Sequence, residues 1–123
     1  MRLVVLFLLA LVFPAAHATC LFARDTKPGD WYRWAAVLIG AEVASVEARG
    51  RLDIVSLDVT ETFKGPANLK TATLEVPNNL WQACRLKRPL PGEHVLGALN
   101  ANNDALVVPL TPSYAQELRH AGK

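Results

Sequence analysis

The sequence predicts a mainly β protein, a small five-stranded antiparallel barrel followed by a short C-terminal helix. Three observations lead to this expectation. Several segments alternate apolar and polar residues, turn-forming residues separate them at close spacing, and a Thr-Pro pair near the end of the chain is typical of a helix start. The length of 123 residues suits a single domain with one modest core.

Residues 1–18 are expected to be an export signal and residues 19–123 the single mature domain. A lone arginine precedes the apolar stretch at 3–13, and an Ala-His-Ala sequence follows at 16–18, which is the usual order of a signal peptide and its cleavage site. The apolar stretch is shorter than the about 20 residues that a membrane-spanning helix needs. We therefore expect a secreted or periplasmic protein with no stable membrane insertion after signal cleavage.

The first two strands are expected at 35–46 and 52–63, joined by a turn at Arg49-Gly50-Arg51. The earlier segment is a near-continuous apolar run with Gly40 inside it, which suits a buried strand bent at the glycine, although the pattern alone leaves a helix open. The later segment alternates, as a half-buried antiparallel strand requires. Its apolar face is predicted to carry Val55, Leu57, Val59 and Phe63.

Three shorter strands are expected at 69–76, 94–99 and 105–110, separated by turns that contain Pro, Gly, Asn and Asp. Thr111-Pro112 then predicts an N-cap and a first-position proline for a helix that runs through about residue 119. Five strands and a terminal helix fit the partly open OB-fold barrel best. A two-sheet sandwich is the alternative, for which seven strands would be typical.

Cys20 and Cys84 are the two cysteines of the chain, and we expect them to form a disulfide. Exported proteins keep their disulfides, and two cysteines allow one intramolecular pairing. The alternative is two free buried thiols. The loss of chain entropy in the unfolded state predicts that a bridge across such a long loop stabilises the fold by about 4 kcal/mol.

A series of short motifs resembles the netrin-like, tissue-inhibitor-of-metalloproteinase-like superfamily, in its short bacterial form. In chain order these are Cys20, AVLIGAEV at 36–43, VTETFKG at 59–65, Cys84 and PGEHVL at 91–96. The order and spacing of the motifs carry the resemblance. It implies an OB-type barrel whose N-terminal cysteine is bridged to a mid-chain cysteine.

The start of the mature chain differs from that of the metalloproteinase inhibitors in this superfamily. Their mature terminus is a Cys-x-Cys segment, and the first cysteine uses its free amino group and carbonyl to chelate the zinc of the target enzyme. Here Leu21 and Phe22 follow Cys20, and Thr19 precedes it and would acylate its amino group. We therefore expect no zinc-directed inhibition from a chain that begins at Thr19. A chain trimmed to begin at Cys20 would restore the chelating geometry and is the alternative.

Binding to another exported or envelope protein is the expected function. The expected binding ridge consists of Thr19, Cys20, Leu21, Phe22, Trp81, Arg85 and Lys87. One alternative is a barrel that binds an oligosaccharide or oligonucleotide by stacking on Trp81 beside Arg85 and Lys87. Another alternative is a structural envelope component. Without Arg2 the chain has 12 Lys and Arg against 11 Asp and Glu, so we expect no nucleic acid partner.

The remaining polar and aromatic residues predict neither catalysis nor metal or cofactor binding. The sequence has no phosphate-binding glycine loop, nucleophile elbow or Cys-x-x-Cys pair, so a non-enzyme is expected. The single carboxylates at Asp53, Asp58 and Glu75 are expected on solvent-facing sides of strands. The aromatic residues near the first strand, at 31, 32 and 34, are expected to pack in the core at one end of the barrel, and an exposed binding patch is the alternative.

Overall fold

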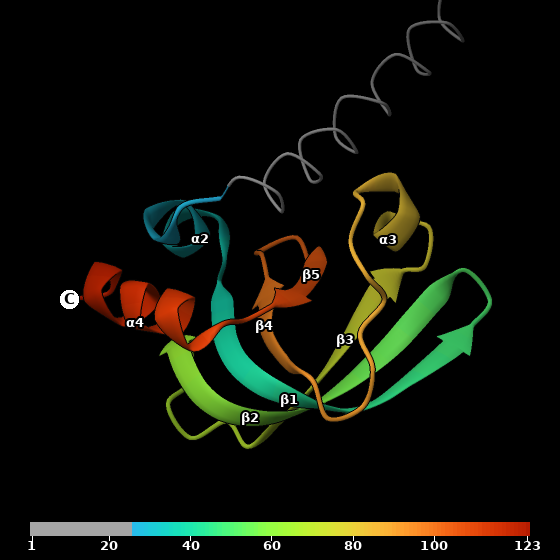
Figure 1. Cartoon of the computed structure of the whole chain (residues 1–123), viewed down its shortest axis with the longest axis horizontal. Coiled ribbons are helices and arrows are strands. Elements are labelled where there is room, and N and C mark those ends of the chain that lie inside the picture. The colour runs from blue at the N-terminus through green and yellow to red at the C-terminus, as the bar shows by residue number, and fades with distance from the viewer. Residues whose placement is uncertain (1–25) are drawn as a thin grey trace, which may run out of the picture.

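The computed structural model describes residues 26–123 and shows one strongly curved sheet with helices beside it (Figure 1). The expected signal peptide, the mature start expected at Thr19, and the cysteine expected to pair with Cys84, Cys20, all lie outside the described residues. Within residues 26–123, no helix combines the length and the apolar character that crossing a membrane would require.

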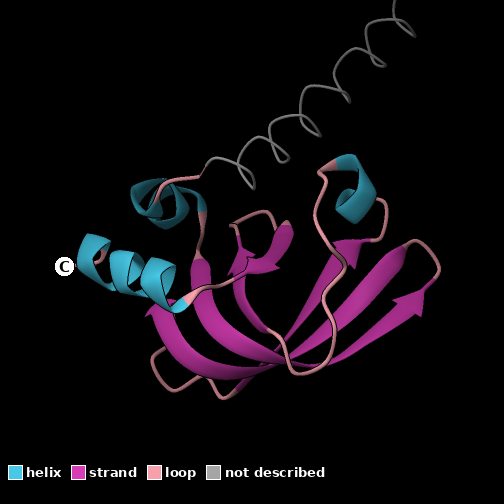
Figure 2. Cartoon of the chain, in the orientation of Figure 1, coloured by secondary structure: helices cyan, strands magenta, loops and turns pink. Residues whose placement is uncertain are grey.

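The sheet contains five antiparallel strands in the order β3-β2-β1-β4-β5 (Figure 2). Their bounds are β1 Val37–Arg49, β2 Leu52–Lys64, β3 Thr71–Pro77, β4 His94–Leu99 and β5 Ala105–Pro109. The prediction of a mainly β fold with five antiparallel strands is confirmed, and the strands form one sheet rather than the two of a sandwich. The edge strands β3 and β5 approach each other, but the strand pairing in the described residues does not join them, so the barrel is not closed.

Three helices accompany the sheet, namely α2 Pro28–Trp34, α3 Leu80–Ala83 and α4 Pro112–Ala121. Helix α4 begins as predicted, because the Thr111 hydroxyl accepts a hydrogen bond of 3.2 Å from the backbone N–H of Tyr114. Sequence reasoning did not anticipate α2 or α3. Both are short and have little helical pattern of their own.

The core has two parts, one on each face of the curved sheet. The first cluster receives side chains from all five strands and from Trp81 of α3. The second cluster lies between the sheet and helices α2 and α4, and contains Trp31 and Leu118. Strand β1 contributes side chains to both clusters, since Leu38 packs in the second cluster and Ile39 in the first. This two-sided burial explains why the start of β1 is an unbroken apolar run.

The β1–β2 hairpin follows the prediction except at its open end. Gly50 takes a positive φ of 60° in the turn, and a register shift lies beside Gly40, where a bend was expected. Val55 and Leu57 are buried in the first cluster, and Val59 packs against it. Phe63 packs against the second cluster instead, so its predicted place on the same face was wrong. The register shifts in β1 occur in this part of the hairpin, where the regular alternation is interrupted.

Candidate binding surface beside helix α3

Asp53 on β2 is buried, with 1% of its surface exposed, and its predicted place on a solvent face was wrong. The sequence did contain a signal for this position. Asp53, Val55 and Leu57 are spaced two residues apart, and residues at that spacing lie on the same face of a strand. Because Val55 and Leu57 point into the core, Asp53 does so as well.

Two donors from the chain after β3 satisfy the buried carboxylate. Trp81 Nε1 donates to Asp53 Oδ2 at 2.7 Å, and Arg88 Nε donates to the same oxygen at 2.9 Å. Arg88 Nη2 donates to Oδ1 at 3.3 Å, so both carboxylate oxygens accept a hydrogen bond. A buried charge is costly unless it is paired and hydrogen-bonded, and Asp53 meets both conditions.

The charge state of Asp53 follows from these contacts. The hydrogen bond from Arg88 lowers the pKa of Asp53 below its usual value, and the hydrogen bond from Trp81 acts in the same direction, although burial opposes both. Asp53 is therefore a carboxylate at neutral pH. We refer to Asp53, Trp81 and Arg88 together as the Asp53 network.

The Asp53 network fixes the residues that leave α3, which we call the 84–90 segment. Cys84 is buried with 1% exposure, and the Leu86 N–H donates to the Trp81 carbonyl at 2.7 Å. Pro89 is also buried. The segment has no regular secondary structure, yet inward contacts recur along it, so its path is well defined.

A tight turn at residues 90–93 then joins the segment to β4. Glu93 N–H donates to the Leu90 carbonyl at 3.1 Å, and Gly92 has the positive φ, 90°, that the third position of a type II turn requires. Backbone hydrogen bonds of 2.7 and 2.9 Å connect Gly92 and Glu93 to Val43 of β1. The turn is therefore held both internally and by the sheet.

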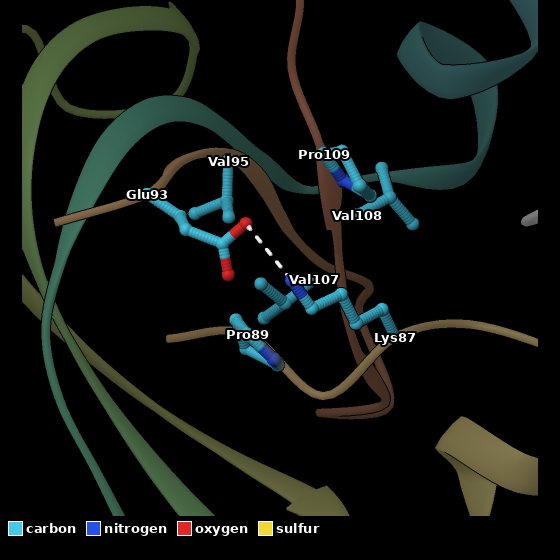
Figure 3. A pocket seen from close by; sticks show the side chains of 7 residues that line it. All are labelled: Lys87, Pro89, Glu93, Val95, Val107, Val108 and Pro109. Carbon is cyan, nitrogen blue, oxygen red and sulfur yellow. Dashed lines mark ion pairs between the residues drawn. The ribbon is translucent and has the colours of Figure 1, made fainter. Parts of the chain in front are cut away.

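The outward side of the 84–90 segment carries Leu90 and two basic side chains, Arg85 and Lys87, and the Arg88 side chain is also 45% exposed although it pairs with Asp53. Leu90 is 51% exposed and is the large hydrophobic residue most open to solvent in the described part of the chain. Arg85 is exposed, and the Lys87 side chain is 68% exposed and lies 4.0 Å from a carboxylate oxygen of Glu93 (Figure 3). The hollow drawn in Figure 3 has room for about 10 Å³, which is no more than one water molecule. This hollow therefore has no space for a small-molecule ligand.

The structure separates the residues of the expected ridge. Arg85 and Lys87 are on the surface, but Trp81 is only 5% exposed and belongs to the first core cluster. Its indole therefore offers no face for stacking. Thr19, Cys20, Leu21 and Phe22 lie outside the described residues, so the predicted pairing of Cys20 with Cys84 remains a prediction.

Sequence reasoning missed Asp53 and Leu90 as members of this surface and its support, and it placed Arg88 in the basic loop after Trp81 without anticipating that it pairs with Asp53. Asp58 and Glu75 are exposed, as expected. Among residues 26–123, no three or more His, Cys, Asp or Glu side chains gather where they could hold a metal ion.

The aromatic residues of α2 contribute to the other side of the molecule. Trp31 is 2% exposed and meets Trp34 edge-on, with ring centroids 6.1 Å apart. The Tyr32 hydroxyl donates to the Leu118 carbonyl at 2.7 Å and so joins α2 to α4. The expectation that these aromatics pack in the core is confirmed for Trp31.

No protein-family model matches this chain, and no curated protein shows significant sequence similarity to it. The resemblance to the netrin-like superfamily therefore stays a prediction.

Proposed function

We propose that this protein is an exported binding module that acts through a protein–protein interface centred on the 84–90 segment. The observation that carries the proposal is the Asp53 network, which fixes an otherwise irregular segment while Leu90 points to solvent. Loops and side chains that become ordered on binding lose conformational entropy, which weakens affinity. A segment that is already held in place loses less.

The exposed side chains favour a partner with an apolar pocket bordered by acidic residues. Leu90 would enter the pocket, with Arg85 and Lys87 facing the acidic border. The Lys87–Glu93 pair does not compete strongly, because both side chains are solvent-exposed and their closest atoms are 4.0 Å apart. The near-neutral mature chain implies that the charges guide orientation more than they supply affinity.

The proposal includes the export signal, the Cys20–Cys84 disulfide, the secreted or periplasmic location and the non-enzymatic role expected from the sequence. A disulfide at Cys84 would hold the start of the 84–90 segment, as Arg88 does further along it. Zinc-directed inhibition is not part of the proposal for a chain that begins at Thr19. The oligosaccharide or oligonucleotide alternative is less well supported, because it relied on the face of Trp81, which is buried.

Paired substitutions test the interface. Leu90→Glu places a charge at the centre of the proposed contact, and Gln116→Glu adds the same charge at an exposed position of α4. The mature protein and both variants are used to capture proteins from culture medium or periplasm, and any captured protein is then purified for calorimetric titration. We expect Leu90→Glu to weaken binding at least tenfold and Gln116→Glu to leave it unchanged. Equal affinity of all three proteins would place the interface elsewhere.

A further inference from the structure

An apolar hollow of about 150 Å³ lies toward the end of the sheet at which β1 begins, whereas Asp53 lies toward the end at which β1 finishes. The strand register defines the two ends. Asp53 pairs with Ala48 near the end of β1, whereas Val37, which lines the hollow, is the first residue of β1 and pairs with Leu99 of β4. Trp81 packs in the core beside Asp53, and residues 26–123 leave space near the start of β1.

Small residues on two strands border this space. Ala72 lies on β3 and Gly97 on β4, and these strands are not hydrogen-bonded to each other. An ideal Cβ on Gly97 would be 3.1 Å from Leu57 and 3.3 Å from Ile39, so the deeper part of the barrel is tightly packed at this point. Tightly packed side chains therefore close the inner side of the hollow.

The wall of the hollow is almost entirely apolar. Its larger side chains are Val37, Ile39, Leu69, Leu74 and Leu99, and Thr73 is the one polar residue in the wall. A charged or strongly polar ligand would lose its water there without gaining hydrogen bonds in return. An enclosed apolar cavity of about this volume can accept benzene or xenon, and the wall of this hollow, although open to solvent on one side, has the same apolar character.

We propose that this hollow is a binding site for a compact apolar molecule, about the size of a benzene ring or a short branched alkyl chain. The site is separate from the proposed protein interface, because none of its lining residues belongs to the Asp53 network or the 84–90 segment. A molecule bound there would contact β1, β3 and β4 together, and so would connect the edge strand β3 with β4, to which it is not hydrogen-bonded.

Benzene is the probe, and methyl NMR spectra of the mature protein give the readout. We expect saturable shifts of the Ile39, Leu74 and Leu99 methyl signals on titration, while Leu118 in the second cluster stays unaffected. Ala72→Leu adds a side chain at the wall and should weaken binding at least tenfold. Ala44→Leu makes the same change at an exposed position of β1 and should bind benzene like the unmodified protein.

Circular dichroism verifies that the variants fold, and Ala72→Val replaces Ala72→Leu if the larger residue prevents folding. The proposal is overturned if the unmodified protein shows no saturable shift, or if Leu118 responds together with the wall residues. It is equally overturned if a folded Ala72 variant binds benzene with unchanged affinity. Leu90→Glu does not alter the wall, so loss of the protein interface and loss of this site can be told apart.

Discussion

Strand β2 carries two carboxylates that pair with arginines from distant parts of the chain, and the two pairs differ mainly in burial. Arg119 of α4 donates to Glu61 at 2.6 and 2.7 Å, which is closer than the contacts of Arg88 with Asp53 at 2.9 and 3.3 Å. The Glu61 side chain is 31% exposed, whereas that of Asp53 is 2% exposed. Water can replace Arg119 beside Glu61 but has little access to Asp53. We therefore expect burial, rather than distance, to decide which of the two pairs the stability of the fold depends on.

Removal of the buried carboxylate should have the largest effect. Asp53→Ala leaves Trp81 Nε1 buried without its acceptor and releases Arg88, so we expect a loss of about 3 kcal/mol in unfolding free energy. Urea denaturation followed by tryptophan fluorescence measures it. Asp58→Ala, on the exposed face of the same strand, should change stability little. Similar losses for both variants would contradict the importance that we assign to burial.

Low pH should destabilise the protein through the Asp53 network, and this effect should be of intermediate size. The pKa of Asp53 is lowered in the folded state, so its contribution to stability is complete above its unfolded pKa of about 3.9 and is lost as the pH falls through the lower folded value. Thermal melts at a series of pH values below about 4.5 should therefore show a steeper decline for the unmodified protein than for Asp53→Asn. If the melting temperatures of the two proteins fell in parallel with pH, Asp53 would have the same pKa in the folded and unfolded states, contrary to this prediction.

The exposed pair should contribute least. Glu61→Gln removes the charge but keeps the side-chain length, and we expect the urea midpoint to remain almost unchanged, because both partners are accessible to water. Measurements in low and high salt sharpen the test, since any contribution of this pair should decrease with screening. A loss as large as that of Asp53→Ala would reverse the ranking of the two pairs.

The strands could be predicted from the sequence because their signals are local. His94–Leu99 follows a Pro-Gly turn and appears with the predicted bounds, and β2 alternates over most of its length. Helix α2 could not be predicted in this way, because its seven residues include three aromatics and no clear apolar stripe. It depends on tertiary contacts such as that of Tyr32 with Leu118.

The candidate surface was predictable only in part. Arg85 and Lys87 were expected at the surface because charged side chains rarely become buried. Trp81 lies close to them in sequence but points the other way, and local composition does not show which side an aromatic faces. The spacing of Asp53 from Val55 indicated burial, but Arg88 follows 35 positions later, and nothing in the pattern links the two.

The strand order also bears on how the chain assembles. In residues 26–123, β1 pairs with β2 in a local hairpin and with β4 across a long stretch of sequence, while β4 and β5 form a second hairpin of their own. Short loops close at lower entropic cost than long ones, so we expect the two hairpins to form before they meet along β1. Until they meet, one edge of β1 remains unpaired and apolar, which makes association with other chains the main hazard during folding.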